Sequence, residues 1–312
     1  MAATPQRRFA LRGRLLLALA GVAAACGGEA APVEEGLTVA DAGFMTPESV
    51  LMDTVADVYL VSNINGGPTD QDDNGFISRV TPDGQVEQLK WIDGESADLT
   101  LHAPKGMAIR GDSLYVADIE CIRVYNRVTG TAVASTCVAG ATFLNDVAIG
   151  PDGSLYVTDS GLRGTAAGLE PTGSDAVYRL FLEEGRQNVT LAKSSELGAP
   201  NGVAVGPRGI LVATFNSGEI IVYDGAGGSR TVVPASNRQL DGIAILPDGG
   251  FLFSSWRDSA VYRVNAAGRV DRVVAGVASP ADIGFDAKRN RVLIPVFTEN
   301  RVLIRDLPAA PQ

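Results

Sequence analysis

Residues 241–253 read Asp-Gly-Ile-Ala-Ile-Leu-Pro-Asp-Gly-Gly-Phe-Leu-Phe, which joins two apolar strands through a Pro-Asp-Gly turn. The first strand of this unit recurs along the chain, strongly or weakly, at residues 48–52, 105–109, 145–149, 201–205 and 281–285. The starts of the six copies are separated by 57, 40, 56, 40 and 40 residues. A repeat of about forty residues is typical of propeller blades.

Each copy is followed by further short strands, for example Glu-Ile-Ile-Val-Tyr at 219–223 and Ala-Val-Tyr-Arg-Val at 260–264. Short apolar strands joined by Asp-Gly and Gly turns, without helical periodicity, predict an all-β protein. Six such repeats predict a six-bladed β-propeller over residues 37–307, with four antiparallel strands per blade. The sixth repeat stops after residues 301–305, so we expect an N-terminal strand at 37–41 to complete it and close the ring.

The starts of the innermost strands should meet at one mouth of the central channel. These positions hold Glu48, Lys105, Asn145, Asn201, Asp241 and, in the sixth repeat, Ala281 or Asp282. The two longest spacings come from loops at 62–75 and 160–175, which should lie over the same mouth. Long loops above one opening predict the walls of a binding site, although two loops among six can share a face by chance.

Carboxylates and carboxamides converging on one axis predict a site for Ca²⁺ or another hard divalent cation. The same residues also favour turns before a strand, which gives them a purely local alternative role. With a single His and no Cys-x-x-Cys pair, the sequence excludes three-His zinc centres and H-E-x-x-H metalloproteases.

Four of these positions resemble the blade starts of the SMP-30/gluconolactonase (LRE-like) family of six-bladed propellers. They lie in the runs Pro47-Glu48-Ser49, Leu144-Asn145-Asp146, Pro200-Asn201-Gly202 and Leu240-Asp241-Gly242. The resemblance covers residues 44–307. It implies that Glu48, Asn201 and Asp241 bind a divalent metal, with Asp241 also the catalytic base. It further implies that Asn145 contacts the substrate, and that the substrate is a lactone or similar ester that is hydrolysed.

Three features depart from that family's pattern. The aromatic residue that usually follows the blade-one Glu in a Glu-x-Pro-x-Trp-like run is absent, with Ser49-Val50-Leu51 in its place. Phe143 stands where characterised members have an Arg, so specificity for a sugar lactone is not implied. Lys105 enters the ring on the second blade, where its ammonium either contacts substrate or neutralises the carboxylates in place of the metal. In the second case the chain is a non-catalytic, NHL-like propeller that binds a protein or glycan at the cell envelope, and this alternative stays open.

Residues at the ends of the second strands are the remaining candidates for substrate contacts. Asp118, Asp159, Asn216 and Trp256 are expected to face the mouth. His102 lies in a nearby loop, where a lone His is more often a surface residue than a catalyst.

The net charge of the 312-residue chain narrows its partners. The chain has 36 acidic and 26 basic residues, for a formal charge of −10. An acidic protein repels phosphates, so the charge disfavours binding to nucleic acid or to an anionic membrane surface and favours solubility and cation binding. The expected partner is the small-molecule substrate that the family resemblance implies.

The first 25 residues predict an export signal. Arg7, Arg8, Arg12 and Arg14 precede an uncharged apolar run at 15–25, which is too short to span a bilayer. The run Ala-Ala-Ala-Cys26-Gly-Gly resembles the lipobox of bacterial lipoproteins, so we expect Cys26 to be lipidated; cleavage after Ala25 without lipidation is the alternative. Residues 26–36 would then be a linker and 308–312 a tail, with the protein held at the cell envelope by its lipid alone.

The other two cysteines, Cys121 and Cys137, lie at equal distances from Thr129, which is in a turn at 127–130. An antiparallel hairpin folded at this turn places them opposite each other, close enough for a disulfide. Exported proteins keep disulfides, which favours the bridge over two buried thiols.

Overall fold

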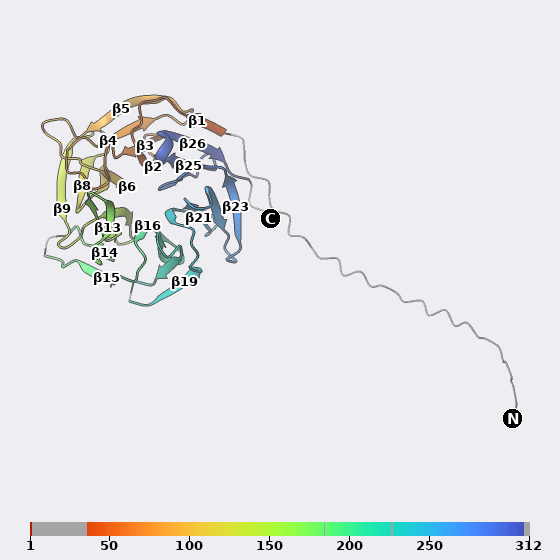
Figure 1. Ribbon diagram of the computed structural model, residues 1–312. Coiled ribbons are helices and arrows are strands. Elements are labelled where there is room, and N and C mark those ends of the chain that lie inside the picture. Colours follow the sequence, from red (N-terminus) through yellow and green to blue (C-terminus); the bar gives the residue numbers. More distant parts are fainter. Residues whose placement is uncertain (2–35, 184, 226, 309–312) are drawn as a thin grey trace.

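The structure is a computed structural model that describes residues 1, 36–183, 185–225 and 227–308. These residues form a six-bladed β-propeller, in which the blades surround a central channel (Figure 1). The predicted signal segment, Cys26, most of the linker and residues 309–312 of the tail lie outside the described residues. Within the described part of the chain, no helix is long and apolar enough to cross a membrane.

Each blade is an antiparallel sheet whose first strand lies innermost. The first blade consists of β2 (Pro47–Asp53), β3 (Val58–Asn63), β4 (Phe76–Val80) and β5 (Val86–Asp93). The second consists of β6 (Pro104–Arg110), β7 (Ser113–Asp118), β8 (Cys121–Asn126) and β9 (Ala132–Cys137). The third consists of β10 (Leu144–Ile149), β11 (Leu155–Asp159), β14 (Ala176–Leu180) and β15 (Val189–Lys193), with an added hairpin of β12 (Leu162–Thr165) and β13 (Gly168–Pro171).

The remaining blades follow the same order. The fourth consists of β16 (Pro200–Gly206), β17 (Gly209–Thr214), β18 (Ile220–Tyr223) and β19 (Ser229–Val233). The fifth consists of β20 (Leu240–Ile245), β21 (Phe251–Ser255), β22 (Ala260–Val264) and β23 (Val270–Ala275). The sixth consists of β24 (Gly284–Asp286), β25 (Arg291–Val296), β26 (Arg301–Asp306) and β1 (Gly36–Val39), with the 3₁₀ turn η1 (Phe297–Glu299) after β25.

The N-terminal strand closes the ring, as the sequence predicts. β1 pairs antiparallel with β26, so that Gly36 lies opposite Arg305 and Val39 opposite Val302. Figure 1 shows the two ends of the fold side by side in the sixth blade. The strand is shorter than the predicted 37–41, because the chain turns at Asp41, whose φ of 53° is left-handed.

The apolar core lies between neighbouring blades. One cluster joins Tyr115 and Ile122 of the second blade to Val147, Leu155 and Tyr178 of the third. Equivalent clusters join the fifth blade to the sixth, and the sixth to the first. Because each blade is packed between two neighbouring blades, an inner strand such as β3 is buried along its whole length.

A buried ion pair also crosses a blade boundary. Arg127, which follows β8, places Nη1 at 2.9 Å from Oδ2 of Asp53 at the end of β2. The Arg127 side chain is 7% exposed and that of Asp53 is 2% exposed. The guanidinium also donates to the Gly111 carbonyl and to Asp112. The first two blades are therefore held together by charge-assisted hydrogen bonds as well as by apolar packing.

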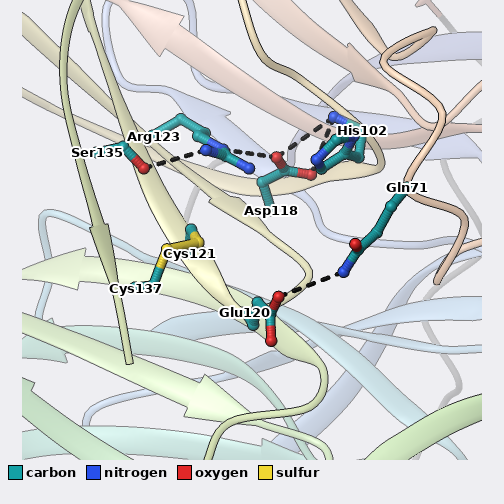
Figure 2. Close-up of a disulfide and its surroundings, with 8 residues drawn as sticks. All are labelled: Gln71, His102, Asp118, Glu120, Cys121, Arg123, Ser135 and Cys137. Carbon is teal, nitrogen blue, oxygen red and sulfur yellow. Dashed lines mark hydrogen bonds and ion pairs between the residues drawn. A yellow bond between two sulfur atoms is a disulfide. The ribbon is translucent and has the colours of Figure 1, made fainter. Parts of the chain in front are cut away.

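The outer hairpin of the second blade carries a disulfide. Cys121 and Cys137 are directly opposed in the β8–β9 ladder, and the structure joins them in a bridge (Figure 2). The bridge encloses a segment that contains β9, in which every residue is exposed. It therefore fixes an edge strand that has little apolar packing of its own.

Candidate active site

The ring at the channel mouth is built by one repeated pairing. In successive blades the residue just before the ring position pairs with the last residue of the second strand, as in Pro104 with Asp118 and Leu240 with Ser255. In the sixth blade the equivalent pair is Pro280 with Val296. The ring residue of that blade is therefore Ala281, and Asp282 lies one residue deeper. The other ring members are Glu48, Lys105, Asn145, Asn201 and Asp241.

These five polar ring residues line one cavity of about 120 Å³. They come from five different blades and are all buried. The structure thus brings together every ring residue that the sequence singled out, apart from the sixth blade, where alanine offers no ligand.

Four oxygen atoms in this cavity have no hydrogen-bond partner among the described residues. They are Oε2 of Glu48, Oδ1 of Asn145, Oδ1 of Asn201 and Oδ1 of Asp241. Buried polar atoms are nearly always paired, so four unpaired oxygens in one cavity point to a bound group. Carboxylate and carboxamide oxygens suit a hard divalent cation. In the described chain no three His, Cys, Asp or Glu side chains are grouped to hold a metal, so a cation here needs the carboxamides as well.

The pKa values of the two ring carboxylates, Glu48 and Asp241, are both raised. Burial raises the pKa of Glu48 well above its ordinary value, and Asp241 and Asp282 raise it further. The pKa of Asp241 is also raised well above normal, first by burial and then by Asp282, although Trp256 and Asn201 lie close enough to lower it. Both shifts arise because buried negative charges lack enough positive charge around them. A divalent cation would supply it.

Lys105 already supplies one positive charge. Its side chain is buried, and its Nζ donates to the Ala103 carbonyl at 2.9 Å and lies 4.5 Å from the centre of the Phe143 ring. Burial lowers the pKa of Lys105 to about 8, while Glu48 and Asp118 oppose that shift. One ammonium therefore faces two ring carboxylates.

Two more buried carboxylates, those of Asp146 and Asp282, lie one residue deeper than the ring. The sequence analysis considered Asp282 and missed Asp146. Asp146 accepts hydrogen bonds from the backbone N–H groups of Val147 and Val203, at 2.7 and 2.6 Å. Asp282 accepts one from the Ser49 hydroxyl, and burial raises its pKa to about 7. Gly106 is the residue after the ring position in the second blade. Only glycine leaves room for the Asp146 side chain, because a Cβ at this position would lie 2.0 Å from Oδ1 of Asp146.

An apolar wall rises above the polar ring. The wall position is the residue directly after each second strand, and the six residues are Ile64, Ile119, Ser160, Phe215, Trp256 and Phe297. All but Ile119 line the cavity. Trp256 lies between two aromatic neighbours, with ring centres 5.5 Å from Phe215 and 5.1 Å from Phe297. The sequence analysis found Trp256 but not its neighbours, although the same position is apolar in five of six repeats.

Asp118, expected to contact substrate, instead holds a loop. Its carboxylate accepts hydrogen bonds from the backbone N–H of Ala103 at 2.8 Å and from Arg123 Nε at 2.8 Å, and it is fully buried (Figure 2). His102 lies in the same loop, where its backbone N–H also donates to Asp118 and its Nδ1 accepts from the backbone of Asp73. Neither Asp118 nor His102 lines the cavity.

Asp159 has the same role in the third blade. Its carboxylate accepts from the backbone N–H groups of Phe143 and Gly161, at 3.0 and 2.9 Å, and from Thr142 at 3.1 Å. Asn216, one residue beyond the wall position, is exposed and outside the cavity lining. The two aspartates position the strand entries that carry Lys105 and Asn145.

Both long loops contribute to the cavity, as expected. The 62–75 loop supplies Pro68, and the 160–175 loop folds into the β12–β13 hairpin and supplies Leu162 and Leu169. Pro68 and Leu169 also border a wider groove of about 740 Å³ between the two loops. The cavity and the groove are therefore adjacent at these two residues.

A six-bladed propeller with carboxylate and carboxamide oxygens at the mouth of its channel defines the class of this protein. The chain belongs to the SMP-30/gluconolactonase/LRE-like family, whose sequence model matches residues 72–294. No curated protein matches the chain in sequence at a significant level.

Solved structures share the fold. A gluconolactonase from Xanthomonas campestris is 18% identical, over 89% of this chain and 92% of that chain, with a TM-score of 0.67. A virginiamycin B lyase from Staphylococcus aureus is 12% identical, over 88% of this chain and 99% of that chain, with a TM-score of 0.62. At these identities the similarity establishes the propeller architecture and leaves the reaction to be argued from the site.

Proposed function

We propose that this protein is a metal-dependent hydrolase that opens a lactone or a similar ester at the channel mouth. The observation that carries the proposal is the group of four buried, unpaired oxygens on Glu48, Asn145, Asn201 and Asp241, which line one cavity. Membership of the SMP-30/gluconolactonase/LRE-like family supports the same reaction class.

Glu48, Asn201 and Asp241 are the residues that would hold the cation, and their hard oxygens favour Ca²⁺. When bound, such a cation polarises an ester carbonyl and lowers the pKa of a nearby water. Asn145 has a different role in the proposal. Its Nδ2 donates to the Ser160 hydroxyl at 3.0 Å, which fixes the carboxamide and leaves Oδ1 directed to substrate or water.

Asp241 is the proposed base. Its carboxylate accepts a proton as water adds to the carbonyl carbon, and the acyl carbon–oxygen bond then breaks. The proton ends on the departing alkoxide oxygen, so a lactone and one water give one hydroxy acid. Asn201 and Trp256 lie close enough to this carboxylate to lower its pKa, against the effect of burial.

The decisive experiment combines calorimetric titration with Ca²⁺ and a lactone hydrolysis assay, before and after chelation with EDTA. We expect one Ca²⁺ per chain and turnover that disappears with EDTA and returns with added Ca²⁺. Absence of binding of Ca²⁺, Mn²⁺ or Mg²⁺ at millimolar concentration, together with no lactone or ester hydrolysis, would overturn the proposal.

One observation favours a second candidate function. Lys105 is a buried cation beside Glu48, where it is placed to offset the acidic ring without a metal. On that account the chain is an NHL-like propeller that binds a protein or glycan ligand without catalysis. The two accounts differ in whether the native protein binds a divalent ion.

For localisation we propose export and attachment to the cell envelope through a lipid on Cys26. The support is the sequence alone, a basic segment and an apolar run that end at that cysteine.

A further inference from the structure

The upper part of the active-site cavity has almost no polar groups left to recognise a substrate. Above the ring, the lining is formed by Ile64, Pro68, Phe143, Ser160, Leu162, Leu169, Ala199, Phe215, Trp256 and Phe297. Only two of these side chains carry a polar atom, which are Ser160 and Trp256.

One of these two polar atoms is already committed, and the other is a single N–H donor. The Ser160 hydroxyl donates to the Pro200 carbonyl at 2.7 Å and accepts from Asn145 Nδ2 at 3.0 Å. The Trp256 indole N–H is buried close to the Asp241 carboxylate and has no hydrogen-bond partner among the described residues. A substrate with several hydroxyls in this space would find one free N–H donor, and its other hydroxyls would lose water without gaining a partner, which is costly.

The wall instead favours apolar groups. Phe215, Trp256 and Phe297 are half-buried and form a continuous aromatic surface from three neighbouring blades. Leu162 and Leu169 of the β12–β13 hairpin line the same cavity. Leu169 is 45% exposed, so it presents an apolar side chain at the rim where the cavity meets the groove.

The size of the cavity adds a second restriction. Its volume of about 120 Å³ is below the ~300 Å³ at which ordinary ligand pockets begin. The cavity has room for one small lactone ring beside the polar ring residues. A longer substituent on that ring would extend out of the cavity at its rim.

From these features we propose that the protein selects a small lactone or ester bearing an alkyl or aryl substituent, and discriminates against polyhydroxylated sugar lactones. This inference rests on the proposed hydrolase function. The aromatic wall would hold the substituent, and Phe215 and Phe297 would be specificity-determining residues. Hydrolysis adds one water across the acyl carbon–oxygen bond, so the product is a hydroxy acid that carries the apolar substituent.

The test compares two lactones with the same six-membered ring, δ-decalactone and glucono-δ-lactone, on the Ca²⁺-loaded protein. We expect kcat/KM for δ-decalactone to be higher by at least about tenfold, the range that hydrophobic pockets and unpaired hydroxyls provide. Equal or faster hydrolysis of glucono-δ-lactone would overturn the inference while leaving the hydrolase intact.

Variants assign the preference to the wall. Phe215→Ala and Phe297→Ala should raise KM for δ-decalactone and leave kcat/KM for glucono-δ-lactone within about twofold. Trp91→Phe, on β5 and outside the cavity lining, is the matched aromatic control and should change neither value. Identical losses for both lactones in the wall variants would show that the wall is structural and would refute its role in selection.

A binding measurement separates this inference from the failure of catalysis. The chain has two tryptophans, so Trp91→Phe leaves Trp256 as the single fluorophore in the cavity. We expect the non-hydrolysable 6-pentylpiperidin-2-one to quench Trp256 at a concentration at least about tenfold lower than gluconolactam. That result supports the apolar preference even if no lactone is hydrolysed, whereas equal binding, or no binding at millimolar concentration, overturns it.

Discussion

The ammonium nitrogen of Lys105 lies 4.5 Å from the centre of the Phe143 ring, on the cavity floor that Glu48 also lines. The aromatic face stabilises the charge, because the ring is electron-rich above its plane. The cation is therefore fixed in place beside a carboxylate that a metal would also need.

Replacing Lys105 with Met tests the two functional accounts. For the hydrolase we expect Ca²⁺ binding in the native protein, equal or tighter binding in Lys105→Met because a repelling charge is gone, and turnover at least about tenfold lower. Calorimetry and a lactone assay provide both numbers. If the native protein binds no divalent ion and the variant gains affinity, Lys105 is a substitute cation and the ligand-binding account is correct.

Asp241 and Asn145 should separate metal binding from substrate handling. Asp241→Ala removes an anionic ligand and the proposed base, so Ca²⁺ affinity and turnover should both collapse. Asn145→Ala should keep Ca²⁺ affinity within a fewfold and lower kcat by roughly 10²-fold, since its proposed contact is with substrate or water. Loss of Ca²⁺ binding in Asn145→Ala would make this residue a metal ligand instead.

The Cys121–Cys137 bridge should contribute to stability. The enclosed segment is short, so the double variant Cys121→Ser, Cys137→Ser should lose about 2–3 kcal/mol of unfolding free energy in urea titration. Thiol titration of denatured, unreduced native protein should detect neither cysteine. Two titratable thiols at these positions would show that the bridge does not form.

The ion pair between Arg127 and Asp53 should matter far more than an exposed pair. Arg127→Met leaves a buried carboxylate without its partner and should cost about 3 kcal/mol of unfolding free energy. Arg163→Met is the control, because Arg163 lies 3.8 Å from Glu170 on the exposed hairpin, and it should cost less than about 0.5 kcal/mol. Equal costs would mean that the inter-blade pair adds nothing beyond a surface contact.

The proposed lipidation of Cys26 can be tested by measuring the mass of the mature protein. Intact mass spectrometry of the membrane-associated protein should find a chain that begins at Cys26 and carries a diacylglyceryl group. Recovery of an unmodified soluble chain that begins at Cys26 or later would contradict lipidation and still agree with export.

The blades and the polar ring were predictable because both are periodic. Residues at the same position of each repeat lie at the same level of the central channel. The sequence alone therefore predicts that Glu48, Asn201 and Asp241 lie close together. The wall was harder to find. Phe215 and Phe297 are single apolar residues after strands, and such residues are more often core than ligand contacts.

The aspartates show the limit of reasoning from position alone. Asp118 ends a second strand just as a substrate contact would, yet its oxygens are used by the backbone of the incoming loop. An aspartate at a strand end serves either purpose, and the choice depends on where the loop passes. Asp146 was missed because a residue next to a ring position resembles an ordinary turn former until the six inner strands are packed together.

The pairing of β1 with β26 also sets the order in which the molecule can be assembled. Among the described residues, the first strand in the chain pairs with the last one, so the sixth blade remains incomplete until β26 has been synthesised. Long-range pairings of this kind form slowly, because a large loop must close before any contact rewards it. The ring can therefore close only after its last strand has been made, an order of assembly that is compatible with the export proposed from the sequence.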